Sequence, residues 1–217
     1  MAGSILDTAR AYLGQMGDVL PRVDWAAIEA FARLVFEAWR DGRRVFVFGN
    51  GGSASTASHH ACDLVKTAAV DGQRRLNAFS LVDNVGLGTA LGNDTSYDET
   101  FSYPLETYAR PGDIAVAISG SGNSANVIRA CAWAKENGVT VVGLTGFSGG
   151  KLKDLADLHI NVPSDNYGIV EDLHLAIGHI VAQILKSRVL AETNGHEGVA
   201  HRRSGVHRVA HSGSIAR

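Results

Sequence analysis

The segment 45–66, VFVFGNGGSASTASHHACDLVK, constrains the fold of this chain most strongly. Four apolar residues come first, and the run ends at Gly49-Asn50-Gly51-Gly52. An apolar run stopped by glycines predicts a buried strand and a tight turn, and the hydroxyl-rich residues that follow predict the start of a helix. Backbone N–H groups at a helix start are unpaired, and the helix dipole favours negative charge there. The segment therefore predicts a strand–turn–helix unit that can bind an anion.

The rest of the chain continues this alternation. Residues 4–40 carry two apolar stripes at helical spacing and predict two leading helices, with Asp24 as the N-cap of the second. Alternating strands and helices predict an α/β fold: a doubly wound, flavodoxin-like sheet of five parallel strands flanked by helices. The predicted strands are 45–48, 76–81, 114–118, 139–144 and 158–162, and the helices after the first strand are 53–66, 84–91, 97–109, 125–137 and 168–190.

Composition excludes several classes of protein. The chain has 217 residues and a formal net charge of −2, which does not favour nucleic acid or a membrane surface as a partner. No apolar run approaches the roughly 20 residues of a membrane span, and charged residues interrupt the amino end, so we expect no secretory signal. Cys62 and Cys131 are interpreted as buried free thiols, which fits a reducing cytoplasm. We expect one domain over 1–190, including the helices of 4–40.

The remainder, 191–217, is rich in Gly, Ser, Arg and His and has no apolar stripe. It is interpreted as a flexible basic tail. The alternative is a metal-binding histidine tract, although the spacing of its four histidines is irregular. These are His196, His201, His207 and His211.

A second glycine–serine loop follows the third predicted strand. Its sequence, Ser119-Gly120-Ser121-Gly122-Asn123-Ser124, places three hydroxyls and several backbone N–H groups at a helix start. The loop has no lysine like that of a nucleotide-binding P-loop, so it suits a phosphomonoester better than a triphosphate. Neither loop spells G-x-G-x-x-G, and no nucleotide cofactor is expected. The alternative is a serine-rich turn that only caps its helix.

Four side chains form a candidate chemical group. His59 and Asp63 are four residues apart, and Glu171 and His179 are two turns apart on one face of the last helix. Histidines with carboxylates suit zinc or another borderline divalent cation. The alternatives are a helix-surface ion pair for His59 with Asp63, and core or interface histidines for His174 and His179.

Several motifs together resemble one family. GNGGSA with HxxxD, ISGSGNSANV, the GND of 92–94 and EDLHLAIGH resemble the sugar isomerase (SIS) domain, up to about residue 190. More narrowly, the chain resembles the phosphoheptose isomerases, which interconvert sedoheptulose 7-phosphate and a heptose 7-phosphate. The resemblance implies a homotetramer with active sites shared between subunits.

The resemblance also implies residue roles. The sugar phosphate would be held by Ser119, Ser121 and Ser124, with Gly120 where relatives often have Thr. The sugar would be bound by Asn50, Gly51, Ser53, Asp94 and Glu171. One metal per subunit, zinc in some relatives, would be held by His59, Asp63, Glu171 and His179.

Two of these residues depart from the family pattern. Relatives usually have Glu at the position of Asp63, so the side chain that carries this carboxylate is one methylene shorter here. They usually have Gln at the position of Glu171, so this residue adds a negative charge. With Asp63 as base and His179 as its proton-transfer partner, we expect an aldose–ketose isomerase that works through an enediol. The alternatives are a non-catalytic regulator of the type that associates with the replication initiator, and an amino-sugar phosphate isomerase or etherase.

Overall fold

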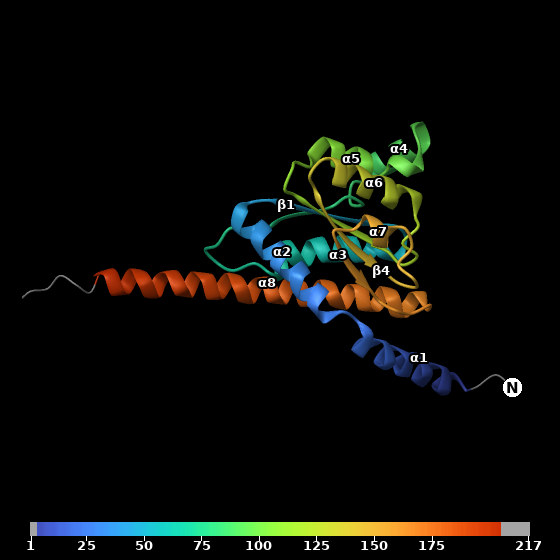
Figure 1. Ribbon diagram of the computed structural model, residues 1–217, viewed down its shortest axis with the longest axis horizontal. Helices are drawn as coiled ribbons and strands as arrows, with labels where there is room; N and C mark the ends of the chain where they lie inside the picture. Colours follow the sequence, from blue (N-terminus) through green and yellow to red (C-terminus); the bar gives the residue numbers. More distant parts are fainter. Residues whose placement is uncertain (1–3, 205–217) are drawn as a thin grey trace, which may run out of the picture.

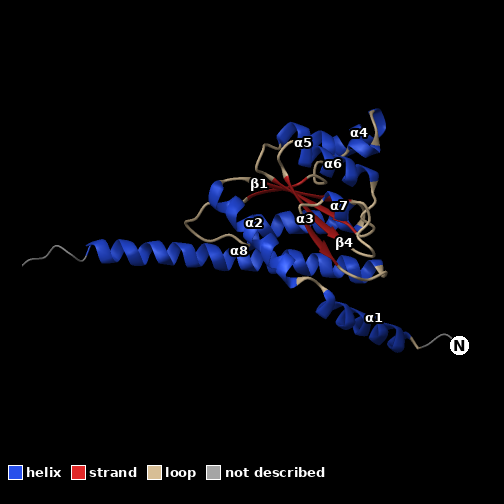
Figure 2. Cartoon of the chain, in the orientation of Figure 1, coloured by secondary structure: helices blue, strands red, loops and turns tan. Residues whose placement is uncertain are grey.

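A sheet of five parallel strands forms the centre of the protein. The computed structural model describes residues 4–204, with side chains for residues 4–193. The strand order is β2-β1-β3-β4-β5, which confirms the predicted flavodoxin-like sheet. Figure 2 shows the strands in red, among the helices. The strands are β1 (Arg44–Gly49), β2 (Asn77–Ser80), β3 (Ile114–Ser119), β4 (Thr140–Thr145) and β5 (Leu158–Asn161).

Helices cover both faces of this sheet (Figure 1). One apolar core lies between the sheet and α2, α3 and α8, and a second lies between the sheet and α5, α6 and α7. The helices are α1 (Ile5–Val19), α2 (Trp25–Asp41), α3 (Gly52–Cys62), α4 (Val85–Asp94), α5 (Ser102–Tyr108), α6 (Ala125–Glu136), α7 (Leu152–Leu155) and α8 (Tyr167–Ser204). Short 3₁₀ turns lie at Leu20–Arg22 and Tyr97–Glu99, and a π-helical turn, η2, lies at Asp63–Thr67.

The strands are buried as the sequence predicts. In β1, Val45 and Val47 belong to the first core, whereas Phe46 and Phe48 belong to the second. All six residues of β3 are buried, as expected for the central strand of a sheet covered on both faces. Each fully buried large apolar side chain contributes roughly 1.5–3 kcal/mol, so these two cores hold the strand ends, and the loops that follow them, in place.

Some element boundaries differ from the prediction. Residues 92–94 end α4 and are not a loop, and the predicted helix 97–109 is divided at Thr100. Pro104 is tolerated because it lies in the first turn of α5, where the N–H that proline lacks has no helical partner. The short α7 is an element that periodicity does not predict. Cys62 is exposed, not buried as predicted, because it lies on a side of α3 that is not packed against the protein; Cys131 is buried.

The last helix is longer than predicted. It continues past residue 190 to Ser204, because adding a residue to an existing helix needs no new nucleation. His207 and His211 lie outside the described residues. By length and mean hydropathy the part Tyr167–Thr193 would also suit a membrane span, but half of its most apolar stretch is buried inside the protein, mostly against α2 and α3.

The first helix extends away from the body (Figure 1). It begins with a capping box, in which Ser4 and Asp7 bond each other's backbone N–H groups. The Tyr12 hydroxyl donates to the Asp172 carboxylate on α8 at 2.5 Å. Its apolar residues Ile5, Leu6 and Leu13 are exposed, at 90%, 65% and 67%.

Candidate active site

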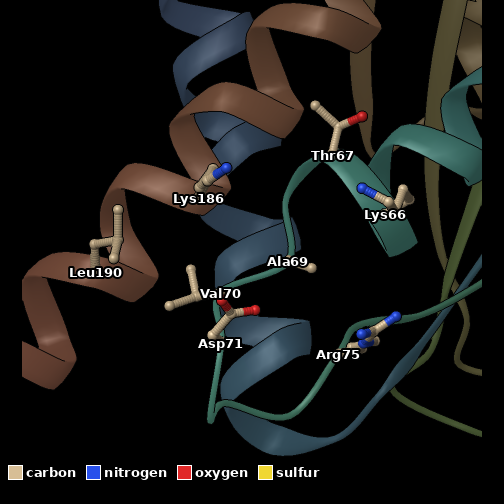
Figure 3. Close-up of a pocket in the computed structure, with 8 residues that line it drawn as sticks. All are labelled: Lys66, Thr67, Ala69, Val70, Asp71, Arg75, Lys186 and Leu190. Atoms are coloured by element: carbon tan, nitrogen blue, oxygen red, sulfur yellow. The ribbon is translucent and has the colours of Figure 1, made fainter.

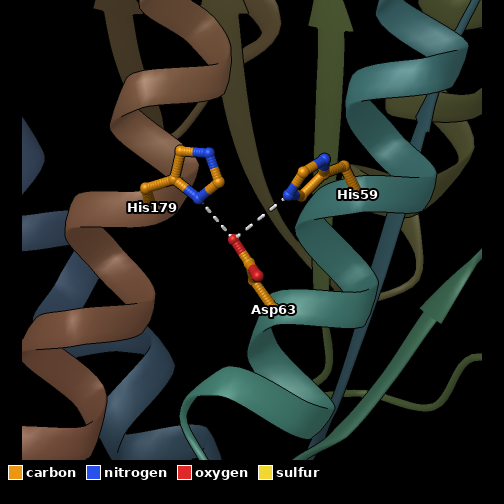
Figure 4. A group of neighbouring side chains, drawn as sticks. All are labelled: His59, Asp63 and His179. Atoms are coloured by element: carbon orange, nitrogen blue, oxygen red, sulfur yellow. Dashed lines mark hydrogen bonds and ion pairs between the residues drawn. The ribbon is translucent and has the colours of Figure 1, made fainter.

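Three of the predicted side chains converge between α3 and α8 (Figure 4). Oδ2 of Asp63 lies 2.6 Å from Nδ1 of His179 and 3.7 Å from Nε2 of His59. The two imidazole rings meet edge to face, with centroids 4.9 Å apart. The ligand atoms of this His59–Asp63–His179 cluster all lie within 4.8 Å of one another. An ion pair of His59 with Asp63 on the surface of α3 therefore does not describe the site fully, because His179 of α8 also contacts Asp63.

Asp63 is held from both sides. Its other oxygen, Oδ1, accepts a hydrogen bond from the Thr67 hydroxyl at 2.7 Å. Burial would raise the pKa of Asp63, but the hydrogen bonds from Thr67 and His179 and the nearby imidazole charges outweigh it, so this pKa lies below its ordinary value. The carboxylate is thus ionised at neutral pH, as a base or metal ligand must be. Thr67 was not predicted, although its i, i+4 spacing from Asp63 was a usable signal.

Within one chain, Glu171 does not join the cluster. Its carboxylate lies against Gly52, where a Cβ would be 2.3 Å from either oxygen. Glu171 lies two turns of α8, about 12 Å, before His179, and its carboxylate reaches the start of α3. Among the described residues, the structure brings together His59, Asp63 and His179 only.

The second loop is open to an anion. Ser124 is the N-cap residue of α6, yet its side chain makes no capping hydrogen bond, which disfavours the alternative of a serine turn that only caps its helix. Oγ of Ser119 accepts from the Gly122 N–H at 3.2 Å and lies 3.5 Å from Oγ of Ser124. Oγ of Ser121 accepts from the Asn123 N–H at 3.3 Å. The first turn of α6 therefore keeps donors available for a phosphate.

The loop after β4 fixes the backbone of this anion loop. Gly122 has φ +64°, and a Cβ there would lie 2.0 Å from the Gly149 carbonyl oxygen. The Leu152 N–H donates to the Gly122 carbonyl at 3.0 Å, and the Gly146 N–H donates to the Gly120 carbonyl at 2.8 Å. These contacts require glycine at 122 and hold the anion loop in one conformation.

The first loop is tied to the second by an amide pair. Asn50 and Asn126 exchange hydrogen bonds of 2.8 and 2.9 Å, and Asn126 also donates to Oγ1 of Thr100 at 3.1 Å. The Tyr97 hydroxyl donates to Asn50 at 2.9 Å. Asn50 was predicted to bind the sugar; in the structure it also joins β1 to α6. Asn126 and Tyr97 were missed, and nothing in the one-dimensional pattern pairs residues 76 apart.

The remaining predicted residues lie around these loops. Ser53 is buried and Gly51 exposed at the start of α3. Asp94 is exposed at the end of α4, where Oδ1 accepts from the Asn93 amide at 2.6 Å, and no described hydrogen bond or ion pair connects it to the cluster. His174 is a core histidine: it is buried and bonded through Nε2 to the Thr145 carbonyl at 3.0 Å.

Two hollows adjoin the site. One of about 490 Å³ lies over the first loop, lined by residues that include Asn50, Gly51 and Tyr97. The other, of about 750 Å³, lies between η2 and α8 (Figure 3) and is lined by Thr67 and three basic residues, Lys66, Arg75 and Lys186. Thr67 thus lines the basic hollow and also donates a hydrogen bond to Asp63.

The donor set of the cluster fits a divalent cation. Two imidazole nitrogens and a carboxylate oxygen are the ligands that zinc takes in catalytic sites with three protein ligands and one open position. The structure therefore brings an ionised carboxylate, two imidazoles and a glycine–serine loop to the carboxyl-end side of the parallel sheet. Ligands of open α/β sheets bind at that edge.

Comparisons with known proteins identify the family of this chain. The chain matches the SIS domain family model over residues 11–146. The phosphoheptose isomerase of Mycobacterium tuberculosis is 42% identical over 170 residues, 78% of this chain and 86% of that protein. The phosphoheptose isomerase of Rhodospirillum rubrum is 40% identical over 172 residues, 79% of this chain and 88% of that protein.

Solved structures extend the agreement to the fold. The phosphoheptose isomerase of Neisseria gonorrhoeae superimposes with a TM-score of 0.79 at 28% identity, over 85% of this chain and 100% of that chain. That of Francisella tularensis gives a TM-score of 0.79 at 27% identity, with the same coverage. The predicted fold and family are therefore confirmed: this chain belongs to the SIS domain family and, within it, to the phosphoheptose isomerases.

Proposed function

We propose that this protein is an aldose–ketose isomerase that converts sedoheptulose 7-phosphate to D-glycero-D-manno-heptose 7-phosphate through an enediol. The observation that carries the proposal is the 2.6 Å contact between Asp63 and His179, in a chain that also keeps an open phosphate loop. The names of its curated relatives support the same reaction. A non-catalytic binding module would need the loop but not the paired base and imidazole.

The residues divide the reaction between them. The Ser119–Ser124 loop holds the phosphate of the open-chain sugar through hydroxyls and the N–H groups of α6. Asp63, ionised at neutral pH, removes the proton from the carbon beside the carbonyl group and returns it to the neighbouring carbon. His179 transfers the second proton between the two oxygens, because an imidazole both gives and takes protons near neutral pH.

A metal would assist at the same place. His59, Asp63 and His179 would hold a divalent cation, with zinc the first choice for this donor set, and the cation supplies Lewis-acid polarisation of the carbonyl group. The metal content of the purified protein, measured by elemental mass spectrometry, tests this assignment. We expect the metal to be lost in His59→Ala, and full activity in metal-free protein would contradict the assignment.

The partners and location follow from the same reaction. We place the protein in the cytoplasm, where sugar phosphates are made, as a homo-oligomer, most simply a tetramer, with sites at subunit interfaces. The exposed apolar residues of α1 support a subunit contact, because patches of this kind mark interaction surfaces. Sedimentation of the purified protein would show the number of subunits.

A turnover assay tests the proposed function. Folded, metal-replete protein is incubated with a panel of seven- and six-carbon sugar phosphates, and the products are separated by chromatography. We expect interconversion of the two heptose 7-phosphates, and loss of at least about a hundredfold in turnover for Asp63→Asn and His179→Ala. Binding of the sugar phosphate without turnover by the wild-type protein would indicate the non-catalytic module instead.

A further inference from the structure

The first turn of α8 packs on glycines from three different loops. A Cβ at Gly52, after β1, would meet the Glu171 carboxylate at 2.3 Å; one at Gly120, after β3, would meet the Tyr167 ring at 3.1 Å. A Cβ at Gly146, after β4, would meet a methyl group of Val170 at 2.5 Å. This turn is therefore fitted to the carboxyl edge of the sheet, where the proposed site lies.

Tyr167 is the residue of this turn that lies over the phosphate loop. Its ring carbons Cε1 and Cδ1 are 3.1 and 3.2 Å from the Cβ position of Gly120, in the middle of the Ser119–Ser124 loop. The ring also meets that of Phe147, with centroids 4.7 Å apart. Phe147 has φ +48°, a left-handed conformation that a phenylalanine rarely adopts and that is commonest at functional sites.

The Tyr167 hydroxyl is available to form a hydrogen bond with a ligand. It makes no hydrogen bond among the described residues, and 55% of the residue is exposed. The phosphate loop itself contains no lysine or arginine, so it offers only hydroxyls and backbone N–H groups to a dianion. A phenolic O–H that donates to a phosphate oxygen forms a charge-assisted hydrogen bond, roughly twice as strong as a neutral one.

We propose that Tyr167 is a substrate-binding residue, whose hydroxyl donates a hydrogen bond to the sugar phosphate and whose ring limits the space beside it. The assignment rests on the proposed function, because it needs a phosphate in the Ser119–Ser124 loop. Gly120 is the counterpart of this tyrosine: a Cβ there, 3.1 Å from the ring, would require the ring to shift by a few tenths of an ångström.

Binding measurements test the assignment. Affinity for sedoheptulose 7-phosphate is measured by calorimetry in the Asp63→Asn background, which binds without turnover, and KM and kcat are measured with Asp63 intact. We expect Tyr167→Phe to weaken affinity and raise KM about tenfold or more while kcat changes little, as for loss of a hydrogen bond to a charged group. Tyr103→Phe, an equally exposed tyrosine on α5, is the matched control and should behave as the unchanged protein.

A second variant tests the ring. Gly120→Ala should raise KM when Tyr167 is present and have little effect in the Tyr167→Ala background, because that background lacks the ring that would have to shift. Equal affinity of Tyr167→Phe and the parent protein overturns the assignment of Tyr167 alone. A parent protein that binds no sugar phosphate overturns the proposed function, and this assignment with it.

Discussion

Each carboxylate oxygen of Asp63 has its own partner. Oδ2 faces His179 and His59, and Oδ1 is fixed by Thr67. The π-helical turn η2 begins at Asp63 and ends at Thr67, and such turns occur frequently at functional sites. Aspartate has one methylene fewer than the glutamate that the family resemblance implies at this position. The hydrogen bond from Thr67 and the π-helical turn hold this shorter side chain in contact with His179.

Thr67→Val should lower activity without unfolding the protein. Valine keeps the shape of threonine but leaves Oδ1 of Asp63 without its donor, so the carboxylate is free to rotate away from the reacting carbon. We expect kcat to fall about 10- to 100-fold with KM nearly unchanged, because a displacement of about 1 Å at a catalytic group costs that much. Thr67→Ser, which restores the hydroxyl, should recover most of kcat. A Thr67→Ser variant as slow as Thr67→Val would contradict this role.

Sequence predicted some of these contacts and not others. The spacing of His59 and Asp63 places both on one helical face, and the proximity of Asp63 to His179, 116 positions further along the chain, follows from family motifs. A shared helical face predicted Glu171 at the same site as His179, but within one chain the carboxylate of Glu171 lies against Gly52. The contacts of Asn126 and Tyr167 depend on the packing of separate elements, which no local pattern records.

At the scale of elements, the site is built from loops that follow strands. Hydrophobic period was enough to predict the five strands and the main helices, because each must present apolar residues to one of two cores. It could not predict α7 or η2, which are too short for a period to develop. The glycine loops were interpreted as anion-binding from the sequence, but contacts between loops, such as that of Gly122 with Gly149, depend on the three-dimensional packing.

Two glycines with similar backbone conformation should respond differently to alanine. Gly72 has φ +76° and nothing within 4 Å of a Cβ, so Gly72→Ala costs only the left-handed conformation, about 1–2 kcal/mol of unfolding free energy. Gly122 has φ +64°, and its Cβ would also overlap the Gly149 carbonyl, so Gly122→Ala should cost about 1–3 kcal/mol more. Urea unfolding of both variants measures the difference. Equal losses of unfolding free energy in the two variants would mean that the loop after β4 moves to accommodate the Cβ of residue 122 without cost.

At the scale of the whole molecule, stability depends on a neutral histidine in the core. Burial lowers the pKa of His174 to about 4 from the ordinary 6.5, although the hydrogen bond to Thr145 opposes this. The folded protein therefore keeps His174 neutral where the unfolded chain is already protonated. The resulting stability is present above pH 6.5 and is lost as the pH falls toward 4, by about 3 kcal/mol in total.

Replacing His174 should flatten the acid dependence. In His174→Gln the amide can still donate to the Thr145 carbonyl but does not titrate. We expect its unfolding free energy to fall less than that of the parent protein between pH 7 and 4.5, whatever its stability at pH 7. Urea titrations at several pH values measure both slopes. Parallel slopes for the two proteins would show that other groups determine the acid sensitivity.

At the scale of the whole molecule, the proposed oligomer would divide the site between subunits. Glu171 lies about 12 Å of helix away from His179, and its carboxylate packs against Gly52, outside the cluster of its own chain. In the proposed oligomer, Glu171 of one chain would serve the His59–Asp63–His179 cluster of another. Catalysis would then require an assembled oligomer, and residues of the same cluster would always come from one chain.

Mixing inactive variants tests this division. Glu171→Ala and His179→Ala should each lose most activity alone, but co-refolding them should restore part of it. In the mixed oligomer, the intact cluster of a Glu171→Ala chain meets the intact Glu171 of a His179→Ala chain. Asp63→Asn mixed with His179→Ala is the matched control, and it should stay inactive because both defects lie in the cluster of a single chain. If the first mixture also stays inactive, Glu171 acts within its own chain or not at all.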